Sequence, residues 1–237
     1  NCRAPGATIT PVAIWHQHYP VIVIGGGHAG VEAAWAAGNV LRAMRARGLS
    51  PERQTSSADV LLVSLDPAKI GVMSCNPANG GLAKGQLVRE VDALHGLMGL
   101  ATDSSGIHFR VLNASRGPAV RGPRAQCDKH AYAESVQRML AGHSGIEVAA
   151  GSCERLLVEG GAIVGAEIAH DGEVRSVSCE SLVLTTGTFM RGLMHTGEQK
   201  TEGGRFGEGA AKGISRHLRE LGFELGRLKT GTPPRLK

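Results

Sequence analysis

A short apolar run that leads directly into a cluster of glycines constrains the fold of this chain more than any other segment. Residues 19–32 read YPVIVIGGGHAGVE, and every residue from Val21 to Ile24 is apolar and β-branched. Such a run is typical of a strand that is buried on both faces of a sheet. An alanine-rich stretch with helical character follows the glycines. The order of strand, glycine turn and helix predicts the first βα unit of a parallel α/β sheet.

The glycines of this segment have the spacing Gly25-x-Gly27-x-x-Gly30, the fingerprint of a dinucleotide-binding turn. The first glycine permits a tight bend, the second lets the backbone approach a pyrophosphate, and the third lets the helix pack closely on the strand. The helix N-terminus would direct its N–H groups and dipole at the phosphates. A glycine turn with a purely structural role is the alternative. The candidate cofactor-binding residues are Gly25, Gly26, Gly27, His28, Ala29 and Gly30.

A second buried strand is predicted at Val60–Leu65, and it ends at Asp66. In the dinucleotide fold, an acid at this place accepts hydrogen bonds from the ribose hydroxyls. The usual separation from the glycines is about 20 residues, whereas Asp66 lies 36 residues beyond Gly30. The polar loop at residues 49–58 would therefore be an insertion. The alternative role for Asp66 is to cap the turn that begins at Pro67.

Cys75 lies in a loop rich in turn-forming residues, MSCNPANGG, which leads into a helix expected from about Lys84 to His95. A cysteine near a helix N-terminus and a lysine can have a lowered pKa and be reactive. A buried, inert thiol is the alternative. We take Cys75 as the candidate catalytic residue. Cys127 is the alternative thiol, because Arg124 and Lys129 could also lower its pKa.

The positive charge of the chain is concentrated in two segments. The net charge is +5, and residues 110–129 and 205–237 carry +4 and +5 of it, so the remainder is acidic. In the first segment, arginines alternate with Gly-Pro pairs, which predicts a rigid loop without regular structure. Such a loop suits a phosphate or carboxylate ligand, and we expect Arg121, Arg124 and Lys129 to bind an anion. A solvated cationic face is the alternative.

The remaining patterns complete a doubly wound parallel sheet with an inserted β-meander. Asp128 is expected to cap a helix that runs to about Ala141. Residues 1–18 show no periodicity and are expected to form a tail, followed by one domain over 19–237. The other predicted elements are a helix ending near Arg47 with Gly48 after it, a strand at 107–112, a meander over 146–177, a buried strand at 181–185, a glycine-rich turn at 205–209 and a helix at about 210–221.

Composition excludes several classes of protein. Aromatic residues make up only 3% of the chain, so surfaces for base stacking are scarce. No apolar run is long enough to span a membrane, and no signal peptide is recognisable. The five cysteines include no CxxC pair, so the usual zinc spacings are absent and no metal site is predicted. Reduced thiols indicate a cytoplasmic protein. Because the chain starts at Asn1 and ends just after a Pro-Pro turn, we expect a fragment.

Five motifs, in order along the chain, carry a resemblance to a known family. They are GGGHAGVEAA, MSCNPANGGLAKGQLVREVDAL, FRVLNASRGPAVRGPRAQCDK, TTGTF and GRLKTGTPPR, and they lie within residues 19–236. Together they closely resemble the MnmG family, also called GidA. These motifs are not shared by ordinary flavin oxidoreductases. The order of the predicted elements is also that of flavin-binding proteins with two dinucleotide folds.

The resemblance implies an FAD-binding, Rossmann-like fold and an activity. Members of the family form 5-carboxymethylaminomethyl groups on the wobble uridine of tRNA, together with the GTPase MnmE. The implied cofactor is FAD, the co-substrates are NADH and methylene-tetrahydrofolate, and glycine or ammonium supplies the nitrogen. A homodimer is also implied.

The resemblance assigns residues as well. Cys75 matches a cysteine proposed as catalytic in the family, and Gly25–Gly30 match the FAD phosphate loop. Cys153 and Glu202 fall by position where the family contacts FAD, although the family carries a smaller residue than Glu202 there. Family chains are much longer, and their NAD-binding insert and helical partner-binding end would lie beyond Lys237. The isolated segment is therefore expected to be inactive and to bind FAD weakly or not at all.

Two other readings compete with the tRNA-modifying flavoprotein. A generic NAD(P)H-dependent flavin oxidoreductase or disulfide reductase is the first, and the missing CxxC pair speaks against the disulfide chemistry. An inactive fragment that keeps only the fold is the second. A related folate- and flavin-dependent family methylates a different tRNA uridine, and we expect it to lack the SCNPA and RAQCD segments.

Overall fold

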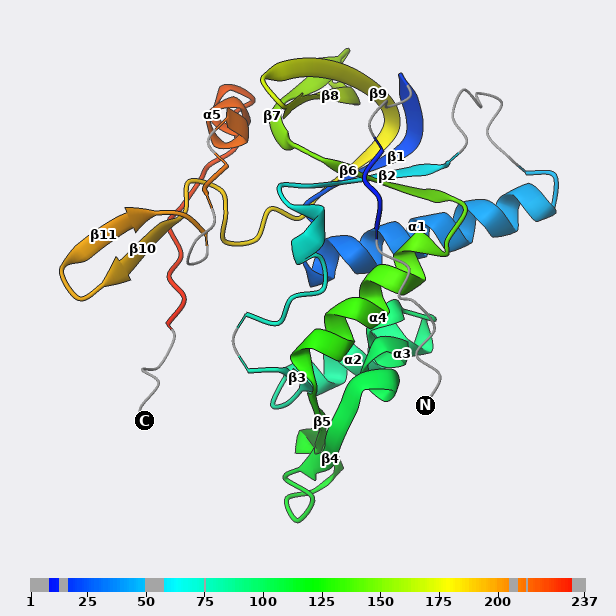
Figure 1. The fold of residues 1–237 in the computed structure, drawn as a ribbon, viewed down its shortest axis with the longest axis vertical. Coiled ribbons are helices and arrows are strands. Elements are labelled where there is room, and N and C mark those ends of the chain that lie inside the picture. Colours follow the sequence, from blue (N-terminus) through cyan, green and yellow to red (C-terminus); the bar gives the residue numbers. More distant parts are fainter. Residues whose placement is uncertain are drawn as a thin grey trace.

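A computed structural model describes residues 9–12, 17–49, 58–74, 76–204, 209–211 and 213–231. Its centre is a six-stranded sheet in the order β6-β2-β1-β9-β8-β7, shown in Figure 1. These strands are β1 (His18–Ile24), β2 (Val60–Ser64), β6 (Ile146–Ala150), β7 (Ser152–Glu159), β8 (Ala162–His170) and β9 (Glu173–Leu184). The predicted α/β fold with a parallel sheet and a β-meander is confirmed.

Strand β9 joins the parallel part of the sheet to the meander. Its C-terminal part pairs in parallel with β1, and its N-terminal part pairs antiparallel with β8. Strands β2 and β6 extend the parallel part on the other side of β1. The chain therefore leaves β1 toward β2 on one side, while β9 lies on the other. The loops after β1 and β9 diverge at this point, which is the topological switch point of the sheet.

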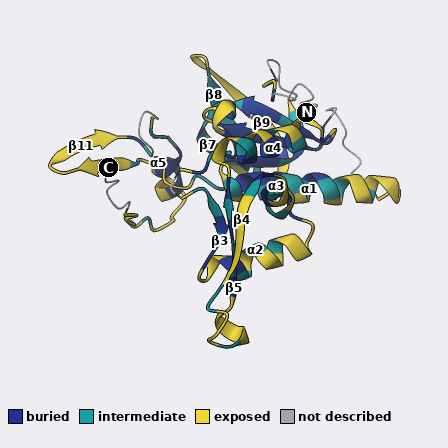
Figure 2. Cartoon of the chain, turned by 60° about the horizontal axis from the view of Figure 1, so that its bottom comes forward, coloured by how far each residue is buried: buried dark blue, intermediate teal, exposed yellow. Residues whose placement is uncertain are grey.

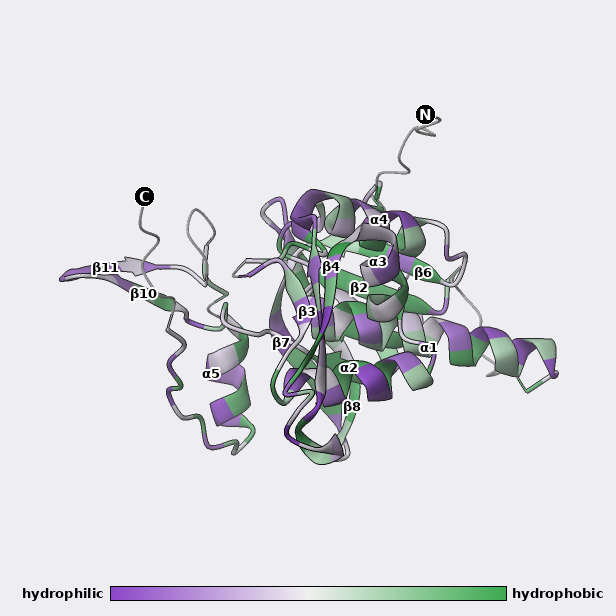
Figure 3. Cartoon of the chain, turned by 90° about the horizontal axis from the view of Figure 1, so that it is seen from below, coloured by the Kyte–Doolittle hydropathy of each residue, from purple (hydrophilic) through white to green (hydrophobic). Residues whose placement is uncertain are grey.

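Helices cover one face of the parallel strands. They are α1 (His28–Ala46), α3 (Leu97–Ser105) and α4 (Lys129–Ala141). Alternate strand residues, including Val23, Val60 and Leu62, pack beneath them with no exposed surface. Figure 2 shows the buried strands and the exposed far end of α1, and Figure 3 shows β2 and β6 as largely hydrophobic. Alternation of side chains across the strand thus gives each face its own core.

The meander and one short helix cover the opposite face. Ile22, Leu61 and Val63 pack there against apolar residues of β7, β8 and β9. Helix α5 (Gly213–Glu220) lies against β7 and buries Ile214 and Leu218 in the same core. No helix in the described part of the chain is both long and apolar enough to cross a membrane.

Two smaller sheets extend from this body. One is a three-stranded sheet in the order β3-β5-β4, and the other is the hairpin β10-β11. Their strands are β3 (Ala78–Gly80), β4 (Gly106–Leu112), β5 (Gly122–Cys127), β10 (Leu193–Thr196) and β11 (Gln199–Glu202). Helix α2 (Lys84–Ala93) packs beside β3, and two single 3₁₀ turns lie at Pro67–Lys69 and Pro118–Val120.

The arginine segment was predicted to lack regular structure, and this prediction is wrong. Residues 122–127 form β5, which pairs with both β3 and β4. Pro123 does not prevent pairing, because a proline is tolerated where its missing N–H would not face a partner; its carbonyl still accepts a hydrogen bond from Gly81 N–H at 2.8 Å. The strand at 107–112 was predicted correctly, as β4.

Other differences concern where elements begin and end. The segment 146–150 belongs to the parallel sheet, not to the meander, because the chain returns through α4 to pair alongside β2. The strand predicted at 181–185 is the second half of β9, which runs unbroken from the meander. Helix α2 ends at Ala93, and α3 follows as a separate helix.

Several local predictions are confirmed. The Asp128 side chain accepts hydrogen bonds from the N–H groups of His130 and Ala131 at the start of α4. Helix α1 ends at Ala46, and Gly48 adopts a positive φ of 70°. The segment predicted as a tail differs from this expectation in part, because Ile9 is buried and Val12 N–H donates to the Val148 carbonyl at 3.0 Å. The loop at 50–57, Cys75 and the turn at 205–208 lie outside the described residues.

Candidate dinucleotide-binding cleft

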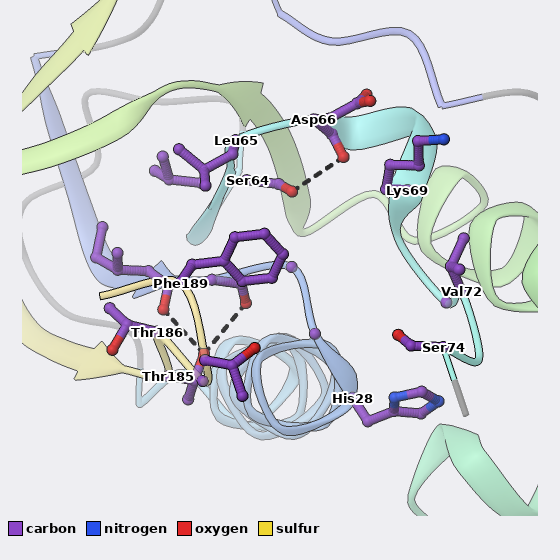
Figure 4. Close-up of a pocket in the computed structure, with 18 of the residues that line it drawn as sticks. His28, Ser64, Leu65, Asp66, Lys69, Val72, Ser74, Thr185, Thr186 and Phe189 are labelled. Carbon is purple, nitrogen blue, oxygen red and sulfur yellow. Dashed lines mark hydrogen bonds between the residues drawn. The ribbon is translucent and has the colours of Figure 1, made fainter. Parts of the chain in front are cut away.

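A cleft of about 630 Å³ opens at the carboxyl end of the parallel strands. The segments that follow all four of these strands line it. They are Gly25–His28 after β1, Leu65, Asp66 and Lys69 after β2, Gly151–Cys153 after β6, and Thr185–Phe189 after β9. This is where ligands bind in open α/β sheets, at the switch point outside the strand ends. Figure 4 shows part of this lining.

The glycine turn is held in place from both neighbouring strands. Gly25 N–H donates to the Val63 carbonyl of β2 at 2.8 Å. On the other side, the Thr185 hydroxyl lies 2.9 Å from the Ile24 carbonyl oxygen and 3.1 Å from that of Gly25. Gly25 has a φ of 113°, a conformation that L-residues rarely adopt. The turn is therefore a rigid part of the sheet edge.

The three fingerprint positions require glycine for different structural reasons. A Cβ on Gly25 would lie 2.3 Å from the Thr185 carbonyl oxygen, and one on Gly30 would lie 1.7 Å from the Gly25 carbonyl oxygen. A Cβ on Gly27 would meet nothing within 4 Å. Gly25 and Gly30 are thus required by the fold, while Gly27 leaves open space beside the backbone in the cleft.

The start of α1 faces this open space. Gly27 is the N-cap residue and offers no side chain, and no acidic residue lies in the first turn. The first N–H groups of a helix have no partner within the helix, and they carry the positive end of its dipole. An anion that binds at Gly27 and His28 would accept these hydrogen bonds, so the segment fits a pyrophosphate.

Asp66 is both a cap and a cleft residue. One of its carboxylate oxygens accepts from Ala68 N–H at 2.9 Å, at the start of the 3₁₀ turn. Asp66 is exposed and lines the cleft at the end of β2. The two roles suggested by the sequence are therefore compatible, because the carboxylate has a second oxygen. The neighbouring Lys69 also lines the cleft, and the sequence reading missed it.

The opposite wall of the cleft is largely apolar. Leu87, Val88 and Val91 of α2 and Met98 of α3 contribute to it, and nothing in the sequence distinguishes them from core residues. Lys84, the first residue of α2, lines the same region. This wall gives the cleft the surface area that a flat aromatic ligand requires.

The loop that carries Cys75 lies at this wall. Cys75 itself is outside the described residues, but Ser74 and Asn76 on either side of it are exposed and line the cleft. The loop of the candidate thiol is thus next to the glycine turn's cleft, although about fifty residues separate the two in sequence. The N-terminus of α2 follows at Lys84.

The three cysteines that the structure describes are free and buried. Cys153 lines the cleft. Its pKa is raised to about 12, mainly because the thiol is buried and to a smaller extent because the negative charge of Glu154 is nearby. Burial also raises the pKa of Cys179 to about 11. Cys127, the alternative reactive thiol, is only 1% exposed in β5. None of the three has the accessible setting of a nucleophile.

Four of the predicted site residues lie away from the cleft. Glu202 is exposed at the end of β11 and is not a lining residue. Arg121 and Arg124 lie in the β4–β5 hairpin, and Lys129 begins α4. In contrast, Thr185–Phe189 were not predicted as site residues, yet they line the cleft, and the Thr185 hydroxyl holds the glycine turn in place. The signal in the sequence was the Thr-Gly turn after a buried strand.

The fold and the cleft together define a dinucleotide-binding α/β domain with an inserted meander. The sequence model of one family, described as glucose inhibited division protein A, matches residues 20–237. The chain therefore belongs to the glucose inhibited division protein A (GidA) family. Its fold is similar to that of Aquifex aeolicus GidA, with a TM-score of 0.79 and 38% identity over 92% of this chain and 33% of that one.

Curated relatives agree with this family. The tRNA uridine 5-carboxymethylaminomethyl modification enzyme MnmG of Granulibacter bethesdensis is 49% identical over 92% of this chain and 32% of its own. The protein of the same name from Salinibacter ruber is 47% identical over 93% and 31%. A GidA-related protein from Thermus thermophilus shares the fold alone, at 20% identity and a TM-score of 0.56. The chain spans about a third of the length of the curated relatives it matches.

Proposed function

We propose that this chain is the FAD-binding portion of a tRNA-modifying enzyme. The enzyme forms 5-carboxymethylaminomethyluridine at the wobble position, acting with the GTPase MnmE and using NADH and methylene-tetrahydrofolate. The observation that carries the proposal is the cleft at the switch point, where the fingerprint glycines meet the ends of four parallel strands. Family membership and relatives that are named for this modification support it.

The residues of the cleft fit FAD. Within the Gly25–Gly30 segment, Gly25–His28 line the cleft and would hold the pyrophosphate, while Ala29 and Gly30 form the first turn of α1 behind them. Asp66 would accept hydrogen bonds from a ribose. Cys153, a neutral buried thiol in the lining, would pack against the cofactor as an apolar residue. FAD supplies redox chemistry when it is bound. We retain Glu202 as a weaker candidate for a cofactor contact, on family position alone.

We assign the nucleophile to Cys75. Uridine C5 is a poor nucleophile, and a thiolate that forms a bond to the adjacent carbon would raise the electron density at C5. C5 then forms a bond to the one-carbon unit of the folate. Removal of the C5 proton by a base restores the C5–C6 double bond and expels the thiolate. The sequence around Cys75 is rich in small residues, which would leave room for a base, and α2 begins nine residues later at Lys84, so its N-terminus and this lysine would favour the thiolate form.

Partners and location complete the proposal. The modification requires tRNA and MnmE, and we propose a homodimer as the assembly. The protein would work in the cytoplasm, where thiols stay reduced. Arg121, Arg124 and Lys129 would contact an anion: a folate glutamate, an FAD phosphate or tRNA. The domain of residues 19–237 would be the unit that carries the cofactor.

The test compares Cys75→Ser with Cys127→Ser in the natural protein that contains this chain. A hydroxyl is far less ionised than a thiol at neutral pH. We therefore expect Cys75→Ser to retain FAD and to lose wobble-uridine modification when MnmE is supplied. The folded Cys127→Ser variant should retain the modification activity. Full activity in the first variant with loss in the second, both retaining FAD, would move the nucleophile to Cys127.

A second measurement tests the activity itself. Deletion of the gene should remove 5-carboxymethylaminomethyluridine from cellular tRNA, and a plasmid copy should restore it. If the modified uridine persists while NADH oxidation is lost, the protein is a generic flavin oxidoreductase.

A further inference from the structure

The β4–β5 hairpin carries positive charge without any compensating acid. Residues 106–127 include four arginines (Arg110, Arg116, Arg121 and Arg124) and His108, but no Asp or Glu. Arg110, Arg116 and Arg121 are exposed, and Arg124 is half-buried. Within the part of the chain that the structure describes, none of these arginines forms an ion pair. The family motif located this charge, but only the strand pairing shows how it is arranged.

The register of the hairpin places two arginines directly opposite each other. Arg110 pairs with Arg124, and His108 pairs with Gln126. Directly opposed residues share a face of the sheet, as do residues two apart in one strand. His108, Arg110 and Arg124 therefore lie on one face. Like charges in opposed positions destabilise a sheet, so the protein keeps an arrangement that weakens its own hairpin.

The other face of β5 anchors the hairpin to the body. Pro123 contacts α2 at Gly85, where an added Cβ would lie 2.8 Å from the proline ring. Ala125 and Cys127 are buried in the core beneath α3 and α4. At the tip, the Arg121 guanidinium donates to the Ala114 carbonyl at 3.0 Å. The cationic face is thus presented on a hairpin whose base is fixed, and Figure 1 shows it projecting from the sheet.

We propose that this face of the β4–β5 hairpin binds the phosphate backbone of tRNA. The proposal rests on the proposed function, and it selects one of the three anions that the arginine segment allows. Strand β4 has seven residues and β5 has six, so the hairpin strands span roughly 20 Å at about 3.4 Å per residue, too long a surface for one pyrophosphate or one folate tail. None of the four arginines lines the cofactor cleft. The guanidinium groups extend from the Arg110–Arg124 pair to Arg116 and Arg121 in the connection between the strands, so they can contact several phosphates of a nucleic acid.

The test measures tRNA binding by the natural protein that contains this chain. The variant is Arg110→Gln with Arg124→Gln. The control is Arg47→Gln with Arg219→Gln, which removes the same charge from the end of α1 and from α5. Affinity for a labelled tRNA with an unmodified wobble uridine is titrated at several salt concentrations. Each phosphate contact contributes about 0.7 to 0.9 to the slope of log affinity against log salt.

We expect the variant to bind tRNA more weakly and its salt slope to be smaller by roughly 1.4 to 1.8. The control should change the slope by less than half as much. FAD content and affinity for a tetrahydrofolate polyglutamate should stay as in the wild type, and the melting temperature should be unchanged or higher.

Two results would overturn the inference. Wild-type affinity and slope in the variant, with tRNA still bound by the unaltered protein, would reject the hairpin as the RNA surface and leave the proposed function standing. Lost folate, FAD or MnmE binding without any change in tRNA affinity would assign the arginines to that ligand. Failure of the unaltered protein to bind tRNA at all would instead reject the proposed function.

Discussion

Replacing each of two glycines of the fingerprint by alanine should affect different properties of the protein: cofactor binding at one position and stability at the other. Gly27 has a φ of −74°, which alanine adopts freely, and its added Cβ would meet nothing within 4 Å. Gly30 lies inside α1, and its added Cβ would be 1.7 Å from the Gly25 carbonyl oxygen. We expect Gly27→Ala to fold normally and to bind the cofactor more weakly. We expect Gly30→Ala to damage the fold itself.

The magnitudes follow from these contacts. At Gly30, restoring a separation of 3.0 Å requires backbone to move by about 1.3 Å. Overpacking of this kind costs about 1–3 kcal/mol, and a backbone carbonyl cannot rotate away, so the upper end applies. The better helix propensity of alanine returns about 1 kcal/mol, which leaves a loss of about 2 kcal/mol.

At Gly27 two small effects oppose each other. Alanine is a poorer N-cap residue than glycine, which costs roughly several tenths of a kcal/mol of stability. It also restricts the unfolded chain, which stabilises by about 0.4–1 kcal/mol. Stability should therefore change by less than about 0.5 kcal/mol. The methyl group would separate the pyrophosphate from N–H donors, and each charge-assisted hydrogen bond is worth about 1.5–3 kcal/mol. FAD affinity should fall about ten- to a hundredfold.

The assay is urea unfolding of both variants of the natural protein that contains this chain, without cofactor, combined with FAD titration followed by flavin fluorescence. Unfolding in the absence of FAD isolates the fold from the stabilisation that a ligand adds. Unchanged FAD affinity in Gly27→Ala would refute the placement of the pyrophosphate at this turn. Wild-type stability in Gly30→Ala would refute the close contact between α1 and Gly25.

Two further predictions concern buried ionisable groups. Cys153 and Cys179 should resist alkylation in the native protein at pH 8, because burial raises their pKa values to about 12 and 11. The two neutral thiols should also contribute to the free energy of unfolding below about pH 9. That contribution should be lost as the pH rises toward the two pKa values. Rapid labelling of either residue, located by mass spectrometry, would contradict this. The Glu32 carboxylate caps α3 by accepting from the N–H groups of Leu97 and Met98, yet burial raises its pKa above 4.5. The wild type should therefore lose stability relative to Glu32→Gln as the pH rises above 4.5, because ionisation of Glu32 opposes folding. A difference in unfolding free energy that stays constant with pH would show that ionisation of Glu32 is not coupled to folding.

Local patterns in the sequence determined much of this protein. The β-branched run before Gly25, the fingerprint spacing and the Asp128 cap each depend on residues close together in the chain, so they could be interpreted without a structure. Short-range sterics decide such features: a glycine permits a conformation, and a side chain next to a helix start caps it. The family motifs added the cofactor and the activity as expectations.

Tertiary structure decided which strands pair and therefore what surrounds the cleft. Ile146–Ala150 has no local feature that separates a parallel strand from a meander strand, and only the return of the chain through α4 places it beside β2. The same holds for the arginine segment, where pairing with β4 sets Arg110 against Arg124. Contacts between residues far apart in sequence depend on the packing of the whole chain, because local propensity is weak beside burial and strand register.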